Sequence, residues 1–174
     1  QFHILRIIKN YICNMKILYL HGYQGSPNWG RIGYLNSFGH EVISPQIDYE
    51  KEHNFFVDLL NTDFDFIVGN SLGGFVAFYL SLYKGKPSLC MNPPLYMDLK
   101  VRMNLPPKYN IKGCNHIHII SGTEDDVVNP FKTFDWLTEN KPTANFKLIN
   151  GMGHRFDLDR FISFTKPIMD NLTL

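Results

Sequence analysis

The sequence has little of what marks secreted, membrane-spanning or nucleic-acid-binding proteins. Its three cysteines are an odd number without a C-x-x-C pair, so we expect reduced thiols and a cytoplasmic location. No apolar run approaches the roughly 18 residues that span a bilayer. We therefore expect no membrane span. The formal net charge is only +1, with neither a basic block nor an acidic tail, so we expect neither nucleic acid nor an anionic membrane surface as partner.

Motifs for cofactors are also missing. The segment "GNSLGG" (69–74) is not a dinucleotide-binding fingerprint, because Ser71 stands where the pattern needs its second glycine. A phosphate-binding G-x-x-x-x-G-K-[ST] does not occur. His116 and His118 would share one face of a strand, but no third ligand accompanies them. We therefore expect neither a cofactor nor a metal.

What the chain does have is the apolar content of one domain. It has 174 residues, of which 44% are hydrophobic and 14% aromatic, enough for a full core. Residues 1–14 precede Met15 as an apolar, basic extension of unclear role, and 15–174 should form the single domain. Trp29, Phe55, Phe56 and Trp136 are expected on helical faces in the core.

Short apolar runs alternate with helix-length segments, which is typical of parallel βαβ units. Strands are expected at 16–20, 41–45, 64–69, 87–92, 116–121 and 145–149. Helices are expected at 27–38 (capped by Ser26, with Pro27 first), 50–61, 72–83, 130–139 (capped by Asn129) and 155–172 (disturbed at Pro167). The fold class is therefore α/β, with a doubly wound, mostly parallel sheet of about six strands and no large lid domain. In such sheets, ligands bind at the carboxyl ends of the strands.

The stretch "FDFIVGNSLGGFVAFYL" (64–80) contains a G-x-S-x-G match centred on Ser71. A serine on a sharp strand-to-helix turn presents its hydroxyl above the sheet, and the crowded positions on either side, Gly69 and Gly73, need to lack side chains. The following helix points its N-terminus at the site, where its dipole favours an oxyanion. The alternative is a junction of small residues without chemistry.

A serine nucleophile needs a base, and the base needs an acid. His154, in "NGMGHRF" after the last strand, is the candidate base; the alternative is a cap of the final helix. The loop "SGTEDDVVNP" carries three consecutive acids, from which we choose Asp125, with Asp126 as the second choice. The chain order Ser71, Asp125, His154 is that of α/β-hydrolases.

An oxyanion needs two backbone donors, for which we expect the N–H groups of Leu72 and of Tyr23 in the first strand's loop. His21 would brace that loop, or simply pack in it. The candidate substrate pocket comprises His21, Gly22, Asn70, Pro93, Pro94 and Tyr96, with Trp29 also considered for the acyl group.

Five segments together resemble a known family: "ILYLHGYQGSP", "IVGNSLGGFVAFYL", "LCMNPP", "SGTEDDVV" and "GMGH". They look like the small α/β-hydrolase esterases of the YqiA/YcfP-like group, from about residue 15 to the C-terminus. The resemblance implies the α/β-hydrolase fold, with Ser71 as nucleophile, His154 as base and Asp125 as acid. It departs at Asn70, where the group often has Ser, and at 98–113, which we expect to overlie the site.

The expected function is hydrolysis of carboxylic esters with short acyl groups, through an acyl-enzyme and without a cofactor. The partner is a small-molecule ester. A thioesterase or an amidase on the same triad fits nearly as well. Outside enzymes, the fold also serves as a non-catalytic binding protein, although that reading expects a lost member of the triad.

Overall fold

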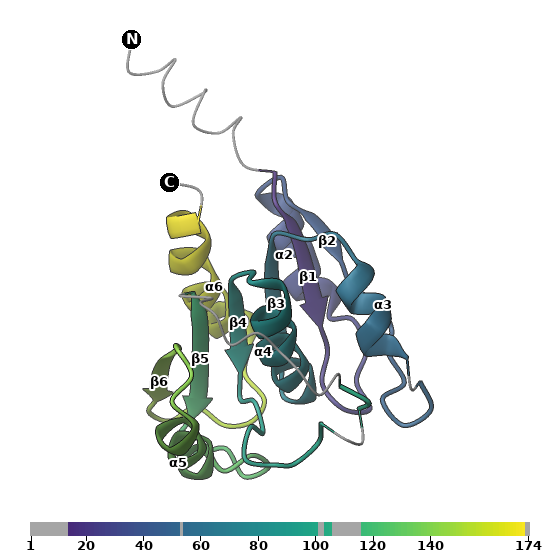
Figure 1. The fold of residues 1–174 in the computed structure, drawn as a ribbon. Coiled ribbons are helices and arrows are strands. Elements are labelled where there is room, and N and C mark those ends of the chain that lie inside the picture. The colour runs from purple at the N-terminus through teal and green to yellow at the C-terminus, as the bar shows by residue number, and fades with distance from the viewer. Residues whose placement is uncertain (1–13, 53, 101–102, 106–115, 173–174) are drawn as a thin grey trace.

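The computed structural model describes residues 14–52, 54–100, 103–105 and 116–172. Its strands are β1 (Lys16–Leu20), β2 (Glu41–Ile43), β3 (Phe66–Asn70), β4 (Ser88–Met91), β5 (Ile117–Gly122) and β6 (Asn145–Ile149). Its helices are α2 (Trp29–Ser37), α3 (Phe55–Asn61), α4 (Leu72–Lys84), α5 (Pro130–Asn140) and α6 (Leu158–Leu172) (Figure 1). The expected extension 1–14 lies outside the described residues apart from its last position.

The six strands form one parallel sheet in the order β2-β1-β3-β4-β5-β6, as the alternating pattern predicted. After β1 the chain adds β2 on one side, and β3 then pairs with β1 on the other. The direction of growth therefore reverses between β1 and β3, which is where open parallel sheets form their ligand crevice. All carboxyl ends meet at the lower edge of the sheet in Figure 1.

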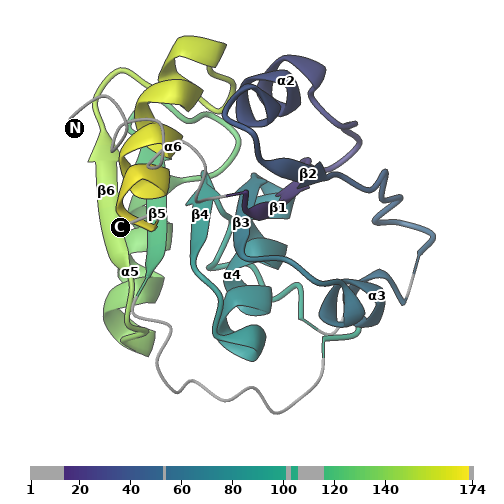
Figure 2. The same ribbon diagram turned by 90° about the horizontal axis from the view of Figure 1, so that it is seen from above.

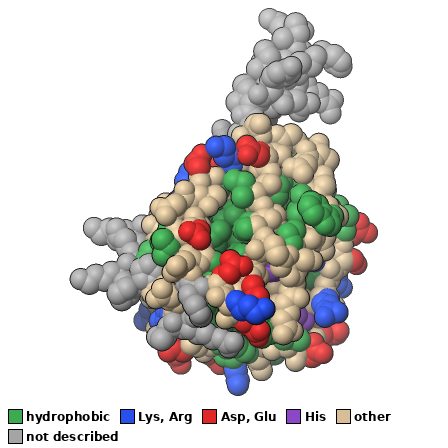
Figure 3. Space-filling model, turned by 90° about the vertical axis from the view of Figure 1, so that its right-hand side faces the viewer, with side chains coloured by type: hydrophobic (Ala, Val, Ile, Leu, Met, Phe, Trp, Pro, Cys, Tyr) green, Lys and Arg blue, Asp and Glu red, His purple; other side chains and the backbone are tan. Residues whose placement is uncertain are grey.

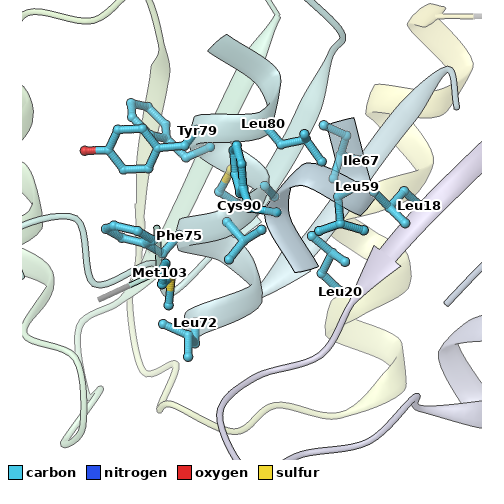
Figure 4. Packing of buried hydrophobic residues seen from close by; sticks show 14 of the residues in the cluster. Leu18, Leu20, Leu59, Ile67, Leu72, Phe75, Tyr79, Leu80, Cys90 and Met103 are labelled. Carbon is cyan, nitrogen blue, oxygen red and sulfur yellow. The ribbon is translucent and has the colours of Figure 1, made fainter. Parts of the chain in front are cut away.

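Helices cover both faces of the sheet. Figure 2 shows α2 and α6 on one side and α3, α4 and α5 on the other. Each face has its own core: Leu35 and Phe161 belong to the first, and Phe56 and Phe78 to the second. Helix α4 is buried from Leu72 through Leu82, because it lies between the sheet and its neighbours. Figure 4 shows this second core, in which Leu72, Phe75 and Met103 lie close together at the start of α4.

Some local expectations were wrong. Helix α2 begins at Trp29 and is capped by Asn28, whose side chain accepts a hydrogen bond from the N–H of Arg31, so Ser26 is not the cap. Trp29 is 79% exposed, because the buried face of α2 begins two residues later. Phe55 and Phe56 are buried as predicted, and Trp136 packs partly buried against the core.

Two further helices differ from expectation. Helix α3 begins at Phe55 rather than near residue 50, since Asp48 and Glu52 close a separate turn ahead of it. Helix α6 continues through Pro167 as far as Leu172, and its buried residues, including Phe161 and Met169, hold it against the sheet. The cap at Asn129 is as expected, since its side chain accepts from two backbone N–H groups.

The surface on the β2 and α3 side mixes acidic, basic and hydrophobic side chains without a large zone of one charge (Figure 3). This distribution fits the formal net charge of +1. Among the described helices, none has the length and apolar character that crossing a membrane requires.

Candidate active site

Ser71 lies on a strained turn between β3 and α4. Its φ of 56° and ψ of −122° belong to a region that residues with side chains rarely adopt. A Cβ on Gly69 would lie 2.1 Å from the carbonyl oxygen of Gly73, and one on Gly73 would lie 2.4 Å from the carbonyl oxygens of Leu20 and His21. Both glycines are therefore required by close backbone approach, and the turn is sharp for the reason that the sequence pattern predicted.

His154 meets Ser71 from the loop that follows β6. Its Nε2 lies 3.1 Å from the Ser71 hydroxyl oxygen. The final helix is capped instead by Asp157, whose carboxylate accepts from the N–H of Arg160. His154 therefore does not act as a helix cap, and its imidazole faces the serine.

Asp125 holds the other ring nitrogen of His154. Its two carboxylate oxygens lie 3.0 and 2.8 Å from Nδ1, and its side chain is only 1% exposed. One of these oxygens also accepts from the N–H groups of Val127 and Val128, which fixes the carboxylate's orientation. Asp126 is exposed, and the hydrogen bonds of the His154 ring go to Asp125 and Ser71 instead. The network favours the tautomer in which Nδ1 donates to Asp125 and Nε2 accepts the serine proton.

Asn92 joins the loops that carry Asp125 and His154, and sequence analysis missed this role. It follows β4, is fully buried and has a φ of 48°. Its Nδ2 donates to the carbonyls of Gly153 and His154, and its Oδ1 accepts from the N–H of Gly122. The signal was the Asn-Pro of "LCMNPP", which marked the family resemblance but has no periodicity to suggest a role.

The loop after β1 is braced by His21, as one of the two readings predicted. His21 is buried, its Nε2 accepts from the N–H of Ile47, and its Nδ1 lies 2.8 Å from the carbonyl oxygen of Gly22. The Tyr49 hydroxyl donates to the carbonyl of His21, and burial raises the pKa of Tyr49, so this hydroxyl keeps its proton. The brace brings Gly22 against Ser71: a Cβ there would lie 3.1 Å from the serine Cβ.

The two predicted oxyanion donors, Leu72 and Tyr23, both line a cavity together with Ser71. Leu72 opens α4, and the first N–H groups of a helix have no partner within it. Tyr23 follows the close approach of Gly22 to Ser71, and its hydroxyl binds Glu50, which ties the loop to the segment before α3.

Two cavities open at Ser71. The larger, of about 1060 Å³, is polar and includes His21, Gly22, Asn70 and His154 in its lining. The Asn70 side-chain oxygen is buried there without a hydrogen-bond partner among the described residues. The smaller, of about 270 Å³, is apolar, and its lining includes Leu72, Pro94, Met97, Leu99, Met103 and Val128.

Not every predicted pocket residue reaches these cavities. Pro93, Tyr96 and Trp29 contribute to the lining of neither one. The carbonyl of Pro93 accepts from Thr133, and the Tyr96 hydroxyl accepts from the N–H of Asn129, so both support the start of α5. From the segment 98–113, Leu99 and Met103 line the apolar cavity, and residues 101–102 and 106–113 lie outside the described residues.

Among the residues that the structure describes, no group of three or more His, Cys, Asp or Glu side chains is arranged to hold a metal ion. His118 is half-buried in β5, and this burial, with a smaller contribution from His116, lowers its pKa. The lowered pKa favours the neutral ring.

Comparison with known proteins identifies the fold. No protein-family profile matches the sequence, and no curated protein matches it either. Solved structures do match. A protein described as a hydrolase of the alpha/beta superfamily, from Xanthomonas campestris pv. campestris, has a TM-score of 0.60 at 15% identity, over 91% of this chain and 96% of its own.

Two further solved structures match the fold over most of the chain. Est1E from Butyrivibrio proteoclasticus has a TM-score of 0.68 at 15% identity, over 90% of this chain and 87% of its own. Zea mays acyl-protein thioesterase 2 has a TM-score of 0.59 at 18% identity, over 92% of this chain and 95% of its own. The chain therefore has the α/β-hydrolase fold, with no large lid domain evident among its described residues.

Proposed function

We propose that this protein is a serine hydrolase that cleaves carboxylic esters. One observation carries the proposal: a buried carboxylate, an imidazole and a serine hydroxyl form a continuous hydrogen-bonded chain, and the serine sits on a strained turn at the crevice of the sheet. The order of these groups and their separation by about 3 Å are what nucleophilic catalysis by serine requires.

In the proposed reaction, the Ser71 oxygen attacks the ester carbonyl as His154 Nε2 takes its proton. The N–H groups of Leu72 and Tyr23 receive the resulting oxyanion. His154 then gives the proton to the leaving alcohol as the carbonyl–oxygen bond breaks, which leaves an acyl-serine. Water repeats the sequence and releases the acid. Asp125 orients the imidazole and stabilises its charged form.

The apolar cavity supports a short acyl group. Its volume of about 270 Å³ lies below the usual range for sites that hold drug-sized ligands. Leu72 lines it beside Ser71, so an acyl chain entering it keeps its carbonyl next to the proposed oxyanion donor.

A thioesterase on the same triad is the second candidate. It is supported by the similarity to an acyl-protein thioesterase and by the flexible methionines Met97 and Met103, which accommodate varied acyl shapes. An amidase would use the same groups. The motifs around Ser71 and Asn92 favour the small YqiA/YcfP-like esterases. The chain length favours a single domain over 15–174, and the three cysteines without a C-x-x-C pair favour a cytoplasmic setting.

The test is labelling with a fluorophosphonate probe, followed by assays on matched p-nitrophenyl esters and acyl-thioesters. We expect wild type to be labelled and Ser71→Ala not to be. Ser71→Ala and His154→Ala should each lower kcat by about ten-thousand-fold or more, because the groups act as a unit. Asp126→Asn is the control for Asp125→Asn and should keep most activity. An unlabelled wild type would favour the non-catalytic binding protein.

A further inference from the structure

Arg31 is a buried cation in the wall of the polar cavity. Arg31 is only 8% exposed, and it lines the cavity together with Ser71 and His154. No carboxylate among the described residues forms an ion pair with it. A buried charge without a counter-charge is costly, so it calls for an explanation beyond packing.

The guanidinium is held firmly by the loop that carries the catalytic base. Nη2 donates to the carbonyl of Phe156 at 2.9 Å, two residues beyond His154, and Nη1 lies 3.4 Å from the Tyr19 hydroxyl. The guanidinium carbon lies 4.4 Å from the centre of the Phe156 ring and 5.1 Å from that of Phe161. These contacts use two of the five N–H groups, and the remaining three have no protein acceptor within the described part of the chain.

The two cavities divide the substrate between them. His154 must protonate the leaving group, and His154 lines the polar cavity but not the apolar one. Leu72, whose N–H would receive the oxyanion, lines only the apolar cavity. The acyl group therefore enters the apolar cavity, and the leaving group departs into the polar one, where Arg31 lies.

We propose that Arg31 binds an anionic group, a carboxylate or a phosphate, on the leaving-group side of the substrate. This inference rests on the proposed hydrolase function and narrows its substrate class to esters of short apolar acids with an anionic alcohol. A planar guanidinium with unused N–H groups matches such an anion with paired, charge-assisted hydrogen bonds.

The selectivity for an anionic leaving group comes from Arg31 itself rather than from the summed charge of the cavity. Two arginines, Arg31 and Arg155, and two acids, Glu124 and Asp126, line the cavity, so its formal charges cancel. Arg155, Glu124 and Asp126 are exposed, and salt screens them. Only Arg31 is withdrawn from solvent, where its bonds to an anion are strongest.

The test uses acetate esters of meta- and para-hydroxybenzoate, in which the acetyl–oxygen bond is cleaved. Each is compared with the same compound whose benzoate carboxylate is neutralised as a methyl ester. In wild type, kcat/KM for the better of the two carboxylates should exceed that of its methyl ester by about 10- to 100-fold, as charge-assisted hydrogen bonds suggest. Arg31→Gln should remove this preference. Arg155→Gln removes an exposed charge from the same cavity and should change the preference by less than about threefold. The phosphate analogues of these esters, tested in parallel, distinguish the two anions.

Several outcomes would overturn the inference. One is a wild type that does not prefer the charged ester over its neutral counterpart at either ring position, with either the carboxylate or the phosphate. Another is an Arg31→Gln variant that loses activity on charged and neutral esters equally, which would mean a purely structural role. A third is an equal effect of Arg155→Gln. Fluorophosphonate labelling separates these failures from failure of the hydrolase proposal, because a labelled wild type without the preference contradicts this inference alone.

Discussion

Ser71 and the Asp125–His154 pair lie at the same edge of the sheet, but different contacts hold them there. Backbone fixes the serine, since Gly69 and Gly73 let β3, α4 and the loop after β1 approach more closely than any side chain would permit. Hydrogen bonds hold Asp125 and the loop of His154 in place, through Asn92 and the N–H groups of Val127 and Val128. Substitutions around Ser71 should therefore cause an abrupt loss of stability, and substitutions around Asp125 and His154 a gradual one.

The largest effect should come from Gly69→Ala. Its Cβ would meet backbone atoms of Gly73 and Gly74 at 2.1–2.8 Å, and neither can move without displacing α4. We expect the free energy of unfolding to fall by about 3 kcal/mol or more and Tm by about 6–12 °C, as measured by thermal denaturation. Gly33→Ala is the control, because nothing lies within 4 Å of its Cβ in the exposed part of α2, and it should stabilise by about 0.5–1 kcal/mol. Equal melting of Gly69→Ala and wild type would refute the claim of backbone crowding.

A smaller and graded effect should follow Asn92→Gly. Glycine keeps the positive φ but removes three hydrogen bonds between the loops, so stability should fall by about 1–3 kcal/mol. The base would be less well positioned, and we expect kcat to fall about 10- to 100-fold with KM nearly unchanged. Asn104→Gly makes the same change at an exposed residue with a φ of 49° and should leave both quantities close to wild type. A change in KM alone would argue against a positioning role.

The smallest effect concerns the pH dependence of stability and His118 in β5, the strand that precedes the loop of Asp125. Burial lowers the pKa of His118 in the folded state, so the unfolded chain binds the proton more readily. Its contribution to stability is therefore present above the unfolded pKa, near 6.5, and is lost as pH falls below it. Replacing His118 with Gln should flatten the decline in Tm between neutral pH and pH 5, by about 2 °C or less. An unchanged or steeper decline would contradict this assignment.

Sequence patterns predicted most of what is local. The glycines around Ser71, the cap at Asn129 and the apolar runs of β1, β3 and β5 are short-range signals, and the strand-end positions of Ser71, Asp125 and His154 followed from them. What the sequence did not reveal depends on contacts between distant segments. Arg31 and Phe156 are 125 residues apart, and the bonds of Asn92 cross 30 to 62 positions. Trp29 is exposed because α2 begins two residues later than expected, at Trp29, and its buried face begins only at Arg31.

The strand order also governs when the protein gains its chemistry during synthesis. From β3 onward each new strand joins the same edge of the sheet, and β6 with the loop of His154 comes last. A ribosome-bound chain that has completed β5 and the loop after it already contains Ser71 and Asp125, but not yet His154, the proposed base. If the proposed triad is correct, we expect the nascent protein to stay inert towards esters until the loop after β6 has been made, so that labelling of Ser71 would report completion of the sheet.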